Sequence, residues 1–579
     1  MKKKLMAGCM VLIASMFVSC GGGGGSGSDS GNVVFNGEDE HKHNTYDGDN
    51  GGENDNNGGN TGGGNTTPAT GDYIVVAWND LGMHCIDKDF SVFSILPPFN
   101  TINAHVIRRG HEPEKLSDTS VKVFYQAQAD SDGTINSTSV GKTNFWDYVQ
   151  SLFGVNLQPD VGLKGFHMAS TIPYKMSFLS KYNIFQAEGI PATPYDDNGT
   201  KDEYPLVKVV AQDLNGNVLA ETTTVMPVSD EMTCIACHGS NSGNTEALPS
   251  QPVNDPNPEK DYRWNILRKH DEKHKISQNM LNQLANKGYY YQSSLEQTAR
   301  NGTPVLCAAC HKSNALPGSG INGVPPLTQA IHSKHARPVA NTGKTGRNAC
   351  YMCHPGSQTQ CLRGAMGNAH VECQYCHGTM ADVGSSSREG WFDMPKCQQC
   401  HQGGHRYKTV FQNDIIGGSL RTVVDNRFAT QPDTPIPGKS LYRFSKGHGG
   451  LQCETCHGSP HAIYPSSLAK DNVQIQALQG YKGTLRECAV CHKNQVPLTA
   501  DEGPHGMHTI GQAWVDKHGG YVEKNGYNMC KACHGTNLRG SELSEVKTSK
   551  SFNTEWGTKT FNTGHAVSCY DCHNGPNGD

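Results

Sequence analysis

The chain has 579 residues, of which 35% are apolar, and it carries 66 glycines and 29 prolines. An apolar fraction this low leaves little material for a core built from protein side chains alone. The formal net charge is −5 and the basic residues form no stripe, which excludes a nucleic-acid-binding surface. The unusual feature of the composition is its 22 cysteines and 27 histidines.

The first residues have the pattern of a targeting signal. Three lysines at positions 2–4 precede an apolar run over residues 5–18, which at about 14 residues is too short to span a membrane permanently. The run ends in Phe17-Val18-Ser19-Cys20, which resembles a bacterial lipoprotein cleavage box with phenylalanine where leucine is usual. We therefore expect residues 1–19 to be a lipoprotein-type signal peptide and Cys20 to be the lipidated N-terminus. The alternative is an ordinary secretory signal without an anchor.

Residues 20–70 consist mostly of Gly, Asn, Asp, Ser and Thr, with almost no apolar side chains. Such a segment cannot bury enough surface to repay the entropy of folding. We expect it to be a disordered tether between the lipidated Cys20 and the rest of the chain.

Residues 71–230 predict a β-rich domain that carries none of the cysteine motifs described below. Short β-branched runs lie at 73–78, 121–125 and 207–211. The turn sequence Asn215-Gly216-Asn217 separates residues 207–213 from 218–225, as in a β-hairpin. We expect a β-sandwich-like domain with a short helical insert near residues 144–153.

The pattern Cys-x-x-Cys-His occurs nine times in residues 231–579, and the copies are numbered here from first to ninth in chain order. Chance placement of these residue types predicts roughly 0.04 copies. Two thiols three residues apart can add to the two vinyl groups of one haem, and the adjoining histidine then ligates the iron. We therefore predict nine c-type haems, attached through Cys234, Cys237, Cys307, Cys310, Cys350, Cys353, Cys373, Cys376, Cys397, Cys400, Cys453, Cys456, Cys488, Cys491, Cys530, Cys533, Cys569 and Cys572.

The histidine that ends each motif is the predicted proximal ligand of the haem iron. Zinc sites and redox dithiols are the alternatives, but zinc takes its ligands in fours and a dithiol has no need of a histidine after every copy. The proximal histidines are His238, His311, His354, His377, His401, His457, His492, His534 and His573.

Other histidines are numerous enough to supply the second axial ligand of most irons. Residues 261–287 are expected to form one helix, on which His270 and His274 share a face. Methionine ligation through Met380, Met394 or Met507 is a minor alternative. The distal candidates are His270, His274, His332, His335, His370, His405, His448, His461, His505, His508, His518 and His565.

The β-rich domain contributes a further unusual stretch, Trp-Asn-Asp-Leu-Gly-Met-His-Cys-Ile-Asp at residues 78–87. Cys85 of this stretch and Cys361, much further along the chain, are the two cysteines of the mature body that no motif uses. They either form a disulfide or remain free, with metal ligation as a third option. His84, His105 and His167 either reach a haem iron from this domain or lie at the surface.

Several segments resemble the multihaem c-type cytochromes of metal-respiring bacteria, which include outer-membrane and extracellular lipoproteins. They are Gly-His-Gly-Gly-Leu-Gln-Cys-Glu-Thr-Cys-His-Gly-Ser-Pro-His at 447–461, Gly-Pro-His-Gly-Met-His at 503–508, and the stretch at 78–87. The resemblance covers about 500 residues. It implies haems stacked in parallel and perpendicular pairs, and a lipid-anchored or secreted protein at the outer membrane, facing the periplasm or the cell surface.

These patterns together predict a β-sandwich-like domain followed by a loop-rich, mainly short-helical multihaem cytochrome domain at residues 231–579. An iron with histidine on both faces has no open position, so we expect electron transfer in anaerobic or extracellular respiration and no catalytic residues. The expected partners are other periplasmic or outer-membrane cytochromes and extracellular electron acceptors. The alternatives are a terminal reductase of nitrite, hydroxylamine or tetrathionate with one open haem, and a haem-filament subunit.

Overall fold

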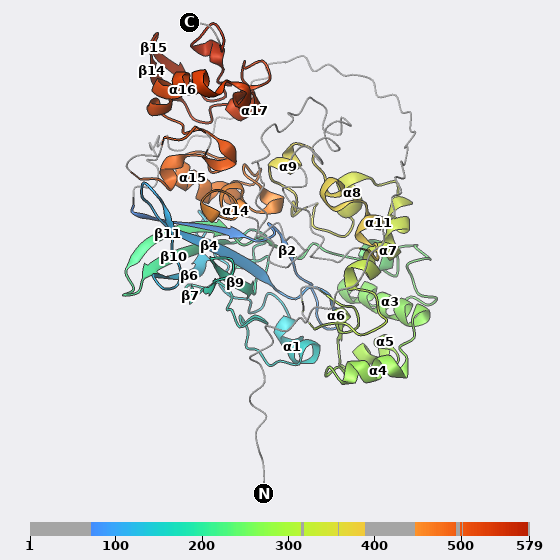
Figure 1. Ribbon diagram of the computed structural model, residues 1–579. Helices are drawn as coiled ribbons and strands as arrows, with labels where there is room; N and C mark the ends of the chain where they lie inside the picture. Colours follow the sequence, from blue (N-terminus) through green and yellow to red (C-terminus); the bar gives the residue numbers. More distant parts are fainter. Residues whose placement is uncertain are drawn as a thin grey trace, which may run out of the picture. The chain divides into compact units, whose positions relative to one another are not determined.

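The computed structural model (Figure 1) describes residues 71–387 and 446–576, apart from 314, 315, 317, 357, 494–497 and 501. These residues belong to one compact unit, so the boundary predicted at residue 230 does not separate two independent bodies. Among the described helices, none has both the length and the apolar character that a membrane span requires. The predictions that lie outside the described residues are the signal peptide, Cys20, the tether, Met394, and the fifth motif with Cys397, Cys400, His401 and His405.

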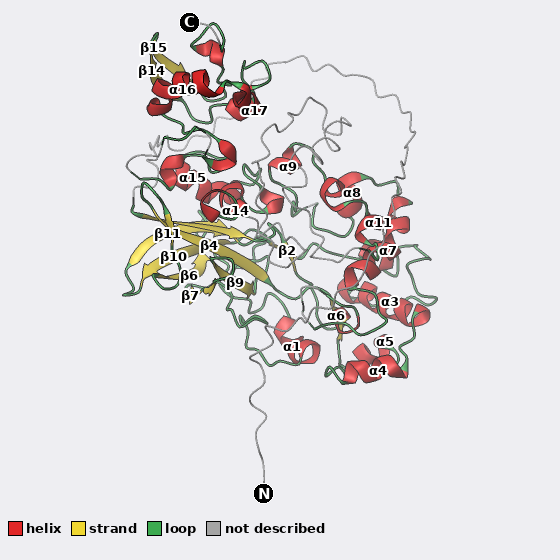
Figure 2. Cartoon of the chain, in the orientation of Figure 1, coloured by secondary structure: helices red, strands yellow, loops and turns green. Residues whose placement is uncertain are grey.

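Residues 73–229, called the β region here, contain two antiparallel sheets (Figure 2). The first has the order β1 (Tyr73–Asn79), β4 (Asn100–Arg108), β9 (Ile184–Ile190), β8 (Ser177–Leu179), with β5 (Glu114–Lys115) paired to β4. The second has the order β11 (Val218–Val225), β10 (Leu206–Asp213), β6 (Val121–Gln128), β7 (Tyr174–Lys175). The predicted strands and the predicted hairpin of β10 and β11 are confirmed.

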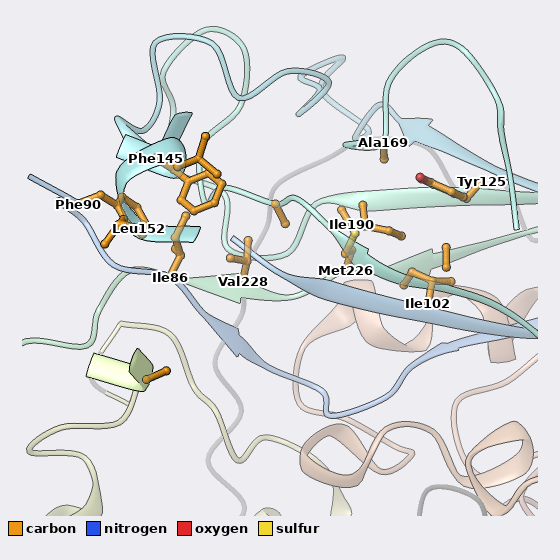
Figure 3. Close-up of a cluster of buried hydrophobic side chains, with 14 of the residues drawn as sticks. Ile86, Phe90, Ile102, Tyr125, Phe145, Leu152, Ala169, Ile190, Met226 and Val228 are labelled. Carbon is orange, nitrogen blue, oxygen red and sulfur yellow. The ribbon is translucent and has the colours of Figure 1, made fainter. Parts of the chain in front are cut away.

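The two sheets share one apolar core. Strand β6 alternates buried and half-buried residues, as expected of a strand with one face on a core. Helix α1 (Phe145–Phe153), the predicted insert, closes one end of this core, and the ring of Phe145 meets that of Phe90 edge-on at 5.1 Å (Figure 3).

Strand β1 is buried on both faces for a different reason. Val75 and Ala77 point into the core between the sheets. Ile74 and Val76, on the opposite face, pack against Leu478 and Val490 of the later part of the chain. The β region therefore serves as a platform on which segments carrying the cysteine motifs lie.

The described residues from 231 onward, called the motif region, consist of short helices and loops. A parallel pair of β13 (Val305–Leu306) with β3 (Phe93–Ser94) joins the two regions, whereas the parallel pair of β12 (Val228–Ser229) with β2 (His84–Cys85) lies within the β region. A hairpin of β14 (Lys550–Thr554) and β15 (Gly557–Phe561) lies near the C-terminus. The longer helices are α3 (Pro258–Lys273), α4 (Gln278–Ala285), α5 (Leu295–Arg300), α7 (Leu327–Ala340), α15 (Val473–Gln479) and α16 (Gln512–Asn525).

The single helix predicted at 261–287 is wrong, because it is two helices. Helix α3 ends at His274, whose backbone is extended at φ −137°. Ser277 then starts α4 by accepting a hydrogen bond from the backbone N–H of Met280. His270 and His274 therefore lie at the end of one helix and at its cap.

Candidate haem sites

Eight of the nine motifs lie in the described residues, and each contains a single helical turn. In five of them the backbone N–H of the histidine donates to the carbonyl of the first cysteine at 2.9–3.0 Å. Residues three and four apart share one face of such a turn, so both thiols and the imidazole are presented together. The turns are α2 (Ile235–His238), α6 (Cys307–Cys310), α8 (Gly346–Cys350), α10 (Cys373–His377), α14 (Cys453–His457), η6 (Cys488–Val490), η8 (Asn528–Cys530) with α17 (Lys531–His534), and η10 (Cys569–Asp571).

The motif cysteines in the described residues are half-buried, free thiols. Burial raises the pKa of Cys234, Cys453 and Cys456 to about 12. In the described part of the chain, the one trio of side chains placed to share a metal ion is Asp130, Asp196 and Asp202, and no motif residue belongs to it. The described motif residues therefore do not gather into a cluster of the kind that zinc needs.

Seven motif histidines face a second histidine at a nearly constant spacing. A metal–imidazole bond is about 2 Å long and the ring centre lies about 1 Å behind its nitrogen, so two imidazoles sharing one iron have centres about 6 Å apart. The observed spacings are 5.7–6.3 Å, which leaves room for one iron in each pair. The pairs, with the motif histidine first, are His238–His335, His354–His332, His377–His461, His457–His505, His492–His448, His534–His508 and His573–His518.

Seven of these fourteen imidazoles, and His311 as well, also have the hydrogen bond that fixes a metal-binding tautomer. When Nδ1–H donates to a backbone carbonyl, the lone pair of Nε2 is left for a metal. Among motif histidines, Nδ1 of His238 lies 3.0 Å from the carbonyl of Ala247, and the same arrangement holds for His311, His492 and His534. Among distal histidines it holds for His332, His335, His508 and His518, at 2.7–2.9 Å. In the sixth-motif pair, Nε2 of His457 faces Nε2 of His505 at 3.4 Å.

The second motif departs from this pattern. In the described residues, the ring of His311 has no stacking contact with another histidine, although His274 contributes to lowering its pKa after burial. Burial, His274 and His311 together lower the pKa of His270 to about 4. Nδ1 of His270 is buried without a hydrogen-bond partner. His270 and His274, at the end of helix α3, are thus near His311, but neither ring faces it at the spacing of the seven pairs.

Two distal candidates are not paired with a described motif histidine. His565 binds the carboxylate of Asp571 instead, with Nε2 and Oδ2 3.0 Å apart. His370 is exposed at φ +58°, and its ring contacts no motif histidine that the structure describes. Their positions close to motif cysteines in sequence did not bring them to those motifs in space.

Three of the four histidines of the β region, His84, His105 and His167, were candidates for reaching a haem iron, and the structure shows other contacts for them. His84 is buried with Nε2 2.8 Å from Oδ1 of Asp80. His105 is buried beside Trp78 and hydrogen-bonds Gln452, while His167 stacks on Tyr174 at 4.5 Å. Iron ligation has no support in this geometry, and the surface alternative is wrong for His84 and His105.

Cys85 and Cys361 are half-buried, free thiols in this structure. Burial raises the pKa of both, and Cys361 contributes to the shift at Cys85, so the two thiols lie close together. Sγ of Cys361 is 3.9 Å from Nδ1 of His461. The disulfide between them stays a prediction.

Several contacts show which motifs are neighbours in space. Helix α7 presents His332 and His335, three residues apart, to the third and first motifs. The thiols of Cys350 and Cys373 hydrogen-bond each other, which joins the third and fourth motifs. His461, the partner of the fourth motif, follows the sixth motif by four residues.

The later motifs continue the series. The N–H of Leu485 donates to the carbonyl of Cys456 at 2.8 Å, which joins the segment before the seventh motif to the sixth. The ring of Trp514 stacks on that of His508, with the ring centres 4.5 Å apart, and its centre is 6.3 Å from that of His518. Trp514 therefore lies between the ligand pairs of the eighth and ninth motifs. At these contacts, one or two side chains therefore separate one motif site from the next.

Comparison with family models, with curated proteins and with solved structures finds no match to this chain. The argument for the sites therefore depends on the motifs and on the geometry around them. Sequence reasoning found the ligand types but missed the buried polar residues that join distant segments, such as Arg363, Gln452 and Gln474. No local sequence pattern marks such a residue.

Proposed function

We propose that this protein binds nine c-type haems covalently and relays electrons through them at the outer membrane or cell surface. The observation that carries the proposal is the set of seven facing histidine pairs with ring centres 5.7–6.3 Å apart. Each pair begins at a motif whose two thiols lie on the same helical turn as the first histidine. Haem iron supplies reversible one-electron exchange when bound.

The chain's own residues determine what such a centre can do. With an iron bound, the two imidazoles of each pair would hold it from opposite sides and would leave no position for a substrate at these seven sites. The carbonyls that accept from Nδ1 hold the ring orientations and leave the lone pair of Nε2 for a metal. Low-potential centres are expected, because histidine on both faces lowers the potential relative to methionine ligation.

The close succession of sites supports a relay. The contacts between the third and fourth motifs, and between the ligand pairs of the eighth and ninth, leave little protein between neighbouring centres. The proposed partners are periplasmic or outer-membrane cytochromes on one side and an extracellular acceptor on the other. The lipoprotein box at Cys20 supports membrane anchoring through lipid.

A terminal reductase is a second candidate, and one observation favours it. His311 lacks the facing imidazole that the other seven described motifs have. An iron with only one firm axial ligand would have a position for a small substrate. The second motif is thus the place where an open site is expected if one exists.

The proposed function is tested by intact-mass measurement of the mature protein combined with a reductive titration. Nine covalent haems and an uptake of nine electrons per chain are expected. A protein that carries zinc at the motifs, or whose mass contains no haem, would contradict the proposal.

A further inference from the structure

The stretch at residues 78–87 is not explained by electron transfer, and its contacts suggest what it does. Residues 79–82, called the Asn79 turn here, follow β1 and are held by the side chain of Asn79, which is 1% exposed. Its Oδ1 accepts from the N–H groups of Leu81 at 3.2 Å and Gly82 at 2.6 Å. Its Nδ2 donates to the carbonyl of Thr101 on β4 at 2.9 Å. The turn is therefore fixed rigidly to the first sheet.

The Asn79 turn lies directly against His461, the distal partner of the fourth motif. The hydroxyl of Ser459 donates to the carbonyl of Asn79 at 2.7 Å. The imidazole of His461 hydrogen-bonds the backbone of Leu81. A Cβ added to Gly82 would lie 3.3 Å from Cβ of His461 and 3.2 Å from Cβ of Ser459, and Gly82 has φ +82°. Only glycine meets both conditions without moving the histidine.

Arg363 secures His461 from the other side. The N–H groups of Arg363 and Gly364 both donate to the carbonyl of His461, at 2.9 and 3.0 Å. The guanidinium, which is 1% exposed, donates to the carbonyl of Gly82 at 2.6 Å. It also forms a bidentate ion pair with Asp471 at 2.6 and 2.8 Å. One buried side chain thus links the turn to the backbone of the ligand.

We infer that the Asn79 turn positions His461, so that the β region sets the axial geometry of the fourth-motif site. The inference rests on the proposed function, since it needs an iron between His377 and His461, whose ring planes lie at 41° to each other. Contacts behind a metal-bound imidazole fix its orientation and its strength as a ligand. Gly82, Asn79 and Arg363 are therefore positioning residues for one of the nine centres.

The test compares Gly82→Ala with Gly199→Ala in the mature haem-loaded protein. The two glycines have nearly the same φ, +82° and +84°, but a Cβ at Gly199 meets nothing within 4 Å. Both variants are compared with His461→Met, which identifies the spectroscopic and potentiometric component of the fourth-motif site. Haem content and far-ultraviolet circular dichroism are measured on each protein.

Gly82→Ala is expected to change the low-spin electron paramagnetic resonance signal and the midpoint potential of the component that His461→Met changes, leaving the other eight unchanged. Gly199→Ala is expected to leave all nine unchanged. If Gly82→Ala does not load haem, Ser459→Ala, which removes one hydrogen bond, should shift the same component less. A Gly82→Ala protein with nine wild-type components, or with a different component shifted, overturns the inference alone. A wild-type protein without low-spin haem would overturn the proposed function instead.

Discussion

The β region and the residues after the fifth motif differ in what fills their interiors. In the β region, apolar side chains of both sheets such as Val123, Tyr125 and Val209 are fully buried in one cluster (Figure 3). In residues 446–576 the buried apolar side chains are few, namely Ala462, Tyr464, Ile475, Leu478, Val490, Leu538 and Phe561. Thiols and paired imidazoles occupy the places where a core would be. The core of the first part is filled by protein side chains, including some from residues 262–321. Under the proposed function, the apolar surface of the haems would take that place in the second part.

The largest expected effect is on the chain made without haem attachment. In cells that lack the attachment machinery, we expect limited proteolysis to digest residues 446–576 while a fragment beginning near residue 71 and containing the β region survives. The haem-loaded protein, digested in parallel and mapped by mass spectrometry, should resist in both parts. Equal resistance of residues 446–576 with and without haem would show that side chains alone stabilise them.

Phe145→Ala should lower the free energy of unfolding of the β region by about 3–5 kcal/mol, because it leaves a cavity in a well-packed core. Phe145 is 0% exposed and contacts the rings of Phe90, Trp146 and Phe153. Denaturant unfolding followed by circular dichroism measures the change, with the exposed Val140→Ala as control. The midpoint potentials should not move. A shift in the midpoint potentials would show that packing in the β-region core affects the haem sites.

His105 should make the β region less stable in acid. Burial and the nearby Lys115 lower the pKa of His105 to about 3, from 6.5 in the unfolded chain. Between these values the unfolded state binds a proton that the folded state does not, so stability falls as pH falls from about 6.5, by up to about 1.4 kcal/mol per pH unit. His105→Gln should flatten this part of the pH profile of unfolding. An unchanged slope would rule out His105 as its source.

His448→Ala should have the smallest effect on stability and a clear effect on spin state. The ring of His448 lies 6.1 Å from that of His492, so its removal should open one iron. One haem of nine is expected to become high-spin in the electron paramagnetic resonance spectrum. His565→Ala is the matched control, since His565 binds Asp571 and should leave every haem low-spin. The same high-spin signal in both variants would contradict the pairing.

The sequence could predict what depends on neighbouring residues. Asn215-Gly216-Asn217 predicted the hairpin, because a tight turn needs these residues. The break between α3 and α4 was missed, because a capping serine inside a polar helical pattern is a weak signal.

The pairing of ligands could not be predicted, because it depends on contacts between distant segments. His448 lies five residues before the sixth motif but faces His492 of the seventh. His332 and His335 precede the third motif, yet α7 divides them between the third and the first. Distance along the chain was therefore a poor guide, as His370 and His565 also show.

The most direct test of the central claim is low-temperature electron paramagnetic resonance of the oxidised protein, with haem counted on the same sample. The relay account predicts low-spin signals for all nine haems, seven of them from the imidazole pairs described above. A high-spin signal that accounts for about one haem would contradict a closed relay and point to an open iron, with the second motif as the first place to look.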